Sequence, residues 1–181
     1  MSRLPPLIYE ELSPEQQRAF QLIAGPRDGV VNGPFPAWIR LPELCERIQS
    51  VSDILRSKTT LKPYIFETLT IIVARWFNAG YMWGAHAGFA IKCGLPESIV
   101  DDINNNRHPV FEDDQDQIIF DVANILVTGK LLPIDIYNRA VEMLGIETLI
   151  EVVTDIGFYN MIATVLNTFD VEQKPDTIPM V

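Results

Sequence analysis

The segment from Glu147 to Phe169 constrains the fold more than any other part of this chain. It is predicted to be the longest helix, and helical spacing gives it one continuous apolar stripe: Leu149, Val152, Val153, Ile156, Tyr159, Ala163 and Leu166. Further apolar residues cover much of its remaining surface: Ile150, Phe158, Met161, Ile162, Val165 and Phe169. A surface helix needs only one apolar face. We therefore expect this helix to lie at the centre of the fold or against another copy of the chain, which predicts a homo-oligomer.

The rest of the chain has the pattern of shorter helices separated by proline and glycine. Helices are expected to begin at Pro14 and Pro42 and to cover the following ranges: Pro63–Ala79, Tyr81–Cys93, Pro96–Asn104, Asp113–Thr128 and Pro133–Leu144. No alternating strand pattern, internal repeat or low-complexity linker is visible. The sequence predicts one all-α domain over residues 1–181, with an extended tail at 170–181.

Charge and cysteine content exclude several classes of function. The net charge of −10 repels phosphate backbones and anionic lipid surfaces, so neither nucleic acid nor a membrane is an expected partner. Cys45 and Cys93 form neither a disulfide framework nor a zinc pattern, and no metal site is predicted. The best candidate for a membrane span, Thr68–Ile91, carries Arg75 and His86 within it. With no export signal visible, a reducing cytoplasm is the expected location.

Glu67 and His86 are the strongest candidates for chemistry. Both lie in apolar surroundings, where a half-buried imidazole is expected to be neutral and a carboxylate to need a partner. Glu67 stands 13 positions before Gly80 and His86 six after it, so a strict hairpin about Gly80 leaves them roughly 10 Å apart. The residues alone leave two readings open, a functional pair or two separately satisfied core groups.

Two other features carry less specific signals. Cys93 follows His86 by about two helical turns, which places its thiol beyond direct activation by that imidazole. The turn-rich segment 25–40 contains Arg27, Arg40 and Trp38. It is open on sequence grounds whether this segment closes over a ligand or forms a packed crossover.

Several motifs together resemble the carboxymuconolactone decarboxylase and AhpD-like family. They are Gly33-Pro-Phe-Pro-Ala-Trp-Ile-Arg-Leu-Pro-Glu-Leu44, Glu67, Ala74-Arg75, Tyr81-Met-Trp-Gly-Ala-His86 and Gly157-Phe-Tyr-Asn-Met-Ile-Ala-Thr-Val-Leu-Asn-Thr-Phe169. The resemblance implies an all-helical AhpD-like domain that forms trimers or hexamers. In the family's peroxidase branch a glutamate precedes a Cys-x-x-Cys pair and a histidine. Here Glu67 and His86 match, whereas the cysteine positions are Ala79 and Met82, and a related branch without cysteines often has a glutamate at the latter.

The resemblance implies a cofactor-free acid–base lyase or isomerase acting on a small carboxylated or lactone-like substrate. Glu67 and His86 would be its catalytic pair. Side chains expected to bind or enclose the substrate are Tyr81, Trp83, Trp38, Arg27, Arg40 and Arg75. Two alternatives remain: a peroxidase-like redox protein using Cys93, and a non-catalytic oligomeric protein that binds a small molecule on the same fold.

Overall fold

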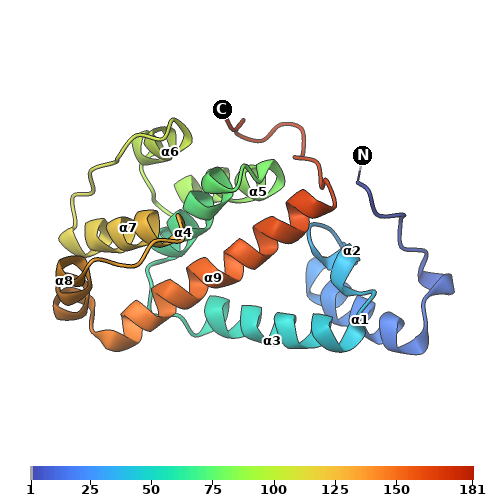
Figure 1. Ribbon diagram of the computed structural model, residues 1–181. Helices are drawn as coiled ribbons and strands as arrows, with labels where there is room; N and C mark the ends of the chain where they lie inside the picture. Colours follow the sequence, from blue (N-terminus) through green and yellow to red (C-terminus); the bar gives the residue numbers. More distant parts are fainter. Residues whose placement is uncertain (1) are drawn as a thin grey trace. The chain divides into compact units, whose positions relative to one another are not determined.

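The computed structural model describes residues 2–181, and over this range the chain is helical without strands (Figure 1). The helices are α1 (Pro14–Ala24), α2 (Phe35–Trp38), α3 (Pro42–Ser57), α4 (Pro63–Trp76), α5 (Gly80–Lys92), α6 (Glu97–Asn104), α7 (Asp114–Leu126), α8 (Ile134–Leu144) and α9 (Ile146–Thr168). Short 3₁₀ turns lie at η1 (Tyr9–Glu11) and η2 (Gly25–Arg27). The predicted all-α class is confirmed, and the predicted helix ends differ from the observed ones by at most three residues.

The contacts within the chain divide it into two compact units. The first contains the described residues up to Thr59 together with Val165–Glu172, and the second contains Thr60–Thr164 together with Gln173–Val181. Helix α9 contributes residues to both. That the chain is a single domain stays a prediction.

The first unit is built on α1 and α3, which pack together. Ser13 caps α1 as its sequence predicts, because its hydroxyl accepts from the Gln16 amide at 3.3 Å while the Gln16 side chain accepts from the Ser13 amide at 3.0 Å. The segment 25–40 packs within this unit. Trp38 and Ile39 are buried there. Their burial favours a packed crossover over a segment that closes over a ligand.

Helix α4 is the core of the second unit. Every residue from Ile65 to Ala74 is buried, because α4 packs against α5, α6 and α7. In Figure 1, α4, α5 and α7 lie side by side. A helical segment that is buried on all sides is expected to be apolar around its circumference, as residues 65–74 are apart from Glu67 and two threonines.

The turn between α4 and α5 differs from the one that the sequence suggested. The predicted hairpin centres on Gly80, whereas in the structure α4 ends at Trp76 and Gly80 is already the first residue of α5. Asn78 makes the reversal in the left-handed region at φ 52°, and the Ala79 amide donates to the Ala74 carbonyl at 2.8 Å. Asparagine tolerates this conformation better than other residues with a Cβ.

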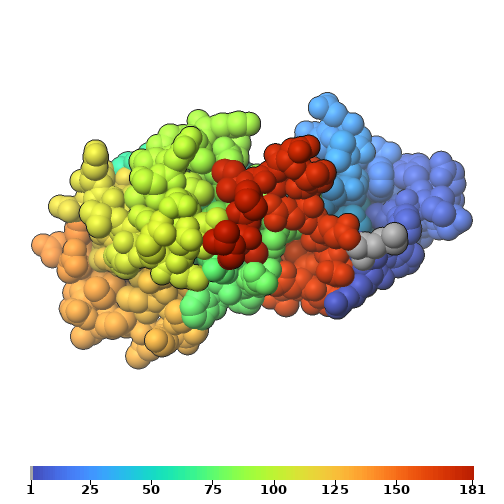
Figure 2. Space-filling view, turned by 90° about the horizontal axis from the view of Figure 1, so that it is seen from above, coloured from blue at the N-terminus to red at the C-terminus, as the bar shows by residue number. Residues whose placement is uncertain are grey.

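The chain end after α9 is neither helix nor strand, and its last residues pack within the second unit. The side-chain amide of Asn104 donates to the carbonyl of Pro179 at 3.0 Å, and its oxygen accepts from the amide of Val181 at 3.1 Å. Figure 2 shows the end of the chain in dark red beside the yellow-green residues of α6. Gln173 and Thr177 lie over Gly84 of α5, at whose position a Cβ would stand 2.6 Å from the hydroxyl oxygen of Thr177.

Helix α9 has one buried side, formed by part of the predicted stripe: Leu149, Val152, Ile156, Tyr159, Ala163 and Leu166. Other apolar residues remain exposed, and Ile150 keeps 57% and Val153 44% of its surface accessible. Within residues 2–181, α9 alone is long and apolar enough to cross a bilayer by length and composition. Core helices of soluble proteins meet the same criterion. The segment Thr68–Ile91, the candidate by sequence, is divided between α4 and α5.

Candidate active site

Glu67 projects from the middle of α4 and is only 2% exposed. Its neighbours along the helix are Phe66 and Thr68, which are equally buried. An ionised carboxylate in such surroundings requires hydrogen-bond donors, because desolvation alone costs several kcal/mol. The carboxylate of Glu67 therefore needs at least one hydrogen-bond donor among the side chains around it.

His86 of α5 is one such donor. Its Nδ1 lies 2.6 Å from Oε2 of Glu67, and its ring stands edge-on to Tyr159 of α9 with the ring centres 5.7 Å apart. The side chain of His86 keeps 18% of its surface exposed, against 3% for that of Glu67. Within the described part of the chain, Nε2 of His86 has no hydrogen-bond partner. Glu67 therefore fixes Nδ1 of the imidazole through a hydrogen bond, and Nε2 is left available to another molecule.

The position of the turn explains why the two side chains meet. Glu67 lies eleven residues before Asn78 and His86 eight residues after it, so a hairpin centred on Asn78 offsets them by three residues. Three residues correspond to roughly 4.5 Å of helix rise, which a glutamate side chain can span. The offset of roughly 10 Å expected from a turn at Gly80 is wrong because the turn lies two residues earlier.

The contact determines which imidazole nitrogen of His86 could exchange a proton. A carboxylate can only accept hydrogen bonds, so contact with ionised Glu67 assigns the proton of the neutral imidazole to Nδ1 of His86. The lone pair is then on Nε2. A carboxylate in this position would stabilise an imidazolium if Nε2 took a proton, as the carboxylate beside a histidine base does in hydrolase triads.

The two positions that hold cysteines in the resembled peroxidase branch are apolar and buried. Ala79 and Met82 are each 1% exposed. Trp83 is fully buried, and its indole N–H has no hydrogen-bond partner among residues 2–181. Tyr81 is half-buried in the first turn of α5. The predicted roles of Tyr81 and Trp83 in enclosing a substrate stay predictions.

Neither cysteine has the environment of a reactive thiolate. Burial raises the pKa of the Cys93 thiol, and the negative charge of Glu67 adds to that rise. Burial raises the pKa of Cys45 to about 11, with Glu46 as a smaller cause. Within residues 2–181 no three histidine, cysteine, aspartate or glutamate side chains are placed to hold a metal ion.

The remaining predicted substrate residues are dispersed. In the first unit, Arg27 donates to the carbonyl of Ile23 at 2.9 Å, and Arg40 donates to that of Pro5 at 2.7 Å. Burial lowers the pKa of Arg27. Trp38 is buried in the same unit. These contacts connect the segment 25–40 to backbone that precedes it. A role of Arg27, Arg40 and Trp38 in binding substrate stays a prediction.

Arg75 belongs to the second unit but lies two helical turns beyond Glu67 on α4, where it lines a pocket that includes neither Glu67 nor His86. Sequence reasoning missed Tyr159, whose ring packs on His86. The sequence placed Tyr159 correctly in the apolar stripe of the last helix. Its polar hydroxyl group, in an otherwise apolar stripe, was the signal that this side of the helix borders a polar site.

Comparison with known proteins establishes the fold. Neither a family model nor a curated protein matches the sequence. Among solved structures, a peroxidase-related protein from Silicibacter sp. TM1040, described as uncharacterized, has a TM-score of 0.76 at 15% identity and covers 97% of this chain and 93% of its own. The debrominase Bmp8 has a TM-score of 0.73 at 12% identity and covers 94% of this chain and 91% of its own.

A cysteine-to-alanine variant of Bmp8 in complex with 2,3,4-tribromopyrrole matches with the same TM-score of 0.73 and 12% identity, covering 94% of this chain and 90% of its own. The fold is therefore the AhpD-like helical fold. Likeness at these identities establishes the fold alone.

Proposed function

We propose that this protein is a cofactor-independent acid–base enzyme acting on a small organic substrate, with Glu67 and His86 as its catalytic pair. The observation that carries the proposal is the 2.6 Å contact between Nδ1 of His86 and Oε2 of Glu67, with Nε2 left without a protein partner among the described residues. A general base needs an available lone pair and a second group that stabilises its protonated form. Both are present here.

The substrate class that we propose is a small carboxylated or lactone-like molecule, with isomerisation or elimination as the reaction. Nε2 of His86 would remove a proton from a carbon next to the carbonyl, and the electron pair of that C–H bond would move into an enolate. In an isomerase the imidazolium returns the proton to a different carbon. In a lyase the enolate expels a leaving group. In a decarboxylase no C–H bond breaks first: the electron pair of the C–CO₂ bond forms the enolate, carbon dioxide leaves, and protonated Nε2 gives its proton to the carbon.

The structural neighbours support a small cyclic substrate. One protein with this fold is a debrominase, and a variant of it binds a brominated pyrrole. A peroxidase-like function is less well supported, because the raised pKa of Cys93 lowers the thiolate fraction that peroxide reduction needs. Buried Ala79 and Met82 supply no thiol.

The test is proton exchange rather than turnover of a known substrate. Lactones, muconate-type acids and other small carboxylates would be incubated with the enzyme in D₂O, and deuterium incorporation at carbon followed by NMR. We expect His86→Ala to slow exchange by about 10²- to 10⁴-fold. Cys93→Ser is the matched control and should exchange like the wild type. Full exchange in both His86→Ala and Glu67→Ala would contradict the proposal.

We further propose that the protein acts in the cytoplasm as a homo-oligomer, a trimer or hexamer. The exposed apolar residues of α9, among them Ile150, Val153 and Met161, support this proposal, because large exposed apolar patches are rare on monomers. A monomer in light scattering at micromolar concentration would contradict it.

A further inference from the structure

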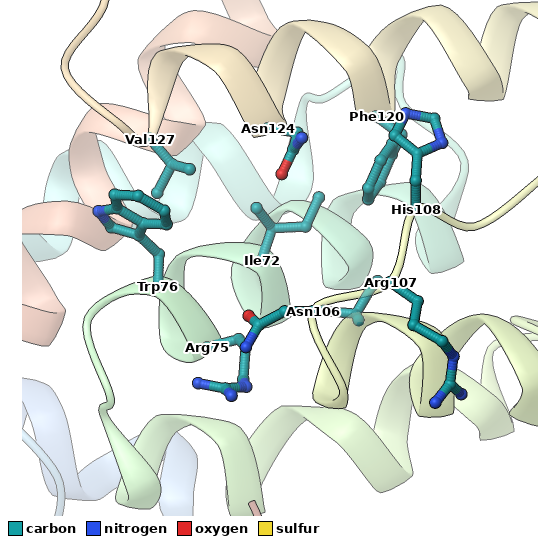
Figure 3. Close-up of a pocket in the computed structure, with 10 residues that line it drawn as sticks. Ile72, Arg75, Trp76, Asn106, Arg107, His108, Phe120, Asn124 and Val127 are labelled. Carbon is teal, nitrogen blue, oxygen red and sulfur yellow. The ribbon is translucent and has the colours of Figure 1, made fainter. Parts of the chain in front are cut away.

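A pocket of about 400 Å³ lies in the second unit, between the end of α4, the segment that follows α6, and α7 (Figure 3). This volume is within the range of small-molecule sites, about 300–1,000 Å³. Trp76, which borders it, follows Glu67 by nine residues on α4. Nine residues correspond to two and a half turns, so the two side chains leave α4 on opposite faces, roughly 14 Å apart along its axis. The pocket is therefore distinct from the acid–base pair.

The charge of the pocket lining is unusual for this protein. Arg75, Arg107 and His108 line it, and none of the residues that line it is acidic. The chain as a whole carries a net charge of −10. A cation-lined cavity in an acidic protein favours an anionic ligand.

Of the three basic side chains, Arg75 is the one available to an anion. Arg107 is bonded to two carboxylates of α6, and its guanidinium points away from the other labelled side chains in Figure 3. Nε2 of His108 lies 3.0 Å from Asp121. Arg75 donates only its Nε, to the carbonyl of Asn104 at 2.7 Å, and no carboxylate pairs with it within residues 2–181. Its two terminal nitrogens form the fork that binds a carboxylate through two hydrogen bonds.

The pocket also offers a flat apolar surface. Trp76 is 56% exposed, an uncommon degree for a tryptophan. Figure 3 shows its indole at one side of the opening, Phe120 at the other, and Ile72 between them. Aromatic and aliphatic walls suit a planar ring, which stacks or packs edge-on against aromatic side chains.

Two side-chain amides complete the lining. In Figure 3 the amide of Asn124 points toward the centre from α7, and that of Asn106 lies across from it. Neither amide has a hydrogen-bond partner in the part of the chain that the structure describes. Each offers one acceptor and two donors, so together they match a hydroxyl or carbonyl substituent on a ring.

We propose that this pocket is a second ligand site that binds a small aromatic carboxylate. The ring packs on Trp76, the carboxylate binds the fork of Arg75, and ring substituents bind the amides of Asn106 and Asn124. The proposal goes beyond the acid–base function and does not depend on it, since no residue of the pair lines the pocket.

Binding of benzoate and 4-hydroxybenzoate to the full chain, measured by calorimetry and tryptophan fluorescence, tests the proposal. Benzamide is the neutral comparison ligand. The variants are Arg75→Gln and Trp76→Leu. The second is an independent variant at an exposed position, because Arg75 also holds the carbonyl of Asn104. Arg139→Gln removes an exposed positive charge of α8 that lies outside the pocket, and it is the matched charge control.

We expect saturable binding of both acids, weaker binding of benzamide, and a loss of affinity of at least about tenfold in Arg75→Gln and Trp76→Leu. Arg139→Gln should bind like the wild type. The proposal is overturned if neither acid binds saturably, if Trp76→Leu binds them unchanged, or if Arg139→Gln weakens binding as much as Arg75→Gln does. This experiment measures binding and not proton exchange. Absence of binding would therefore overturn the second ligand site without bearing on the acid–base function.

Discussion

The contact between Glu67 and His86 predicts a large and specific loss of stability when the imidazole is removed. In His86→Ala the carboxylate of Glu67, 2% exposed, loses the Nδ1–H donor that lies 2.6 Å away. A hydrogen bond to a charged group contributes about 1.5–3 kcal/mol, and removing one partner of a fully buried ion pair costs about 3–5 kcal/mol. Because His86 keeps 18% of its side-chain surface exposed, water can reach the site, so we expect a loss of about 2–3 kcal/mol.

The assay is urea unfolding followed by circular dichroism at fixed protein concentration. A double-mutant cycle with Glu67→Ala, His86→Ala and the double variant should give a coupling free energy of about 1–2 kcal/mol. His86→Asn places an amide N–H near the position of Nδ1, so it should recover about half of the lost stability. The same variant has no equivalent of Nε2 and should remain inactive. Phe89→Ala, at a half-exposed position on the same helix, controls for truncation of α5.

The reasoning would be refuted by additive single variants. If the double variant lost the sum of the two single losses, the side chains would not interact in solution. A loss below about 0.5 kcal/mol in His86→Ala would have the same meaning, since surface substitutions stay within that range. The proposed acid–base function would then lose its structural basis.

Two further predictions concern packing and thiol reactivity. Gly84→Ala places a Cβ 2.6 Å from the hydroxyl oxygen of Thr177, so the C-terminal segment should be displaced and its backbone amide hydrogens should exchange faster with solvent. At Gly157 a Cβ meets open space, so Gly157→Ala should instead gain up to about 1 kcal/mol of helix stability. Cys93 should react slowly with iodoacetamide at pH 8, because burial and, to a smaller extent, the charge of Glu67 raise the pKa of its thiol and keep it protonated. Glu67→Gln removes the second cause and should accelerate the reaction roughly twofold. An unchanged rate would mean that Glu67 carries no charge near this thiol.

The helix boundaries could be predicted because local chemistry decides them. The hydroxyl of Ser13 and the carboxylate of Asp113 each accept a backbone N–H at the start of a helix, and both residues stand in sequence patterns typical of such caps. Gly145, at φ 80°, ends α8 where its sequence indicates. These signals extend over three or four residues and need no tertiary contact.

The geometry of the site depended on information that is not local. Asn78 adopts a left-handed conformation, whereas the sequence gives equal reason to place the reversal at Gly80. A difference of two residues decides whether Glu67 and His86 touch or lie roughly 10 Å apart. The pocket beside Trp76 was equally hidden, because its walls come from segments about 50 residues apart in sequence that only tertiary packing brings together.

The reversal at Asn78 also limits how this protein can vary. Adding or deleting one residue between Trp76 and Gly80 would change this tight turn and shift α5 relative to α4. The imidazole would then swing out of reach of the carboxylate, although both residues would still be encoded. Among relatives that share the pair, the length of this short connection should be as invariant as the two side chains themselves.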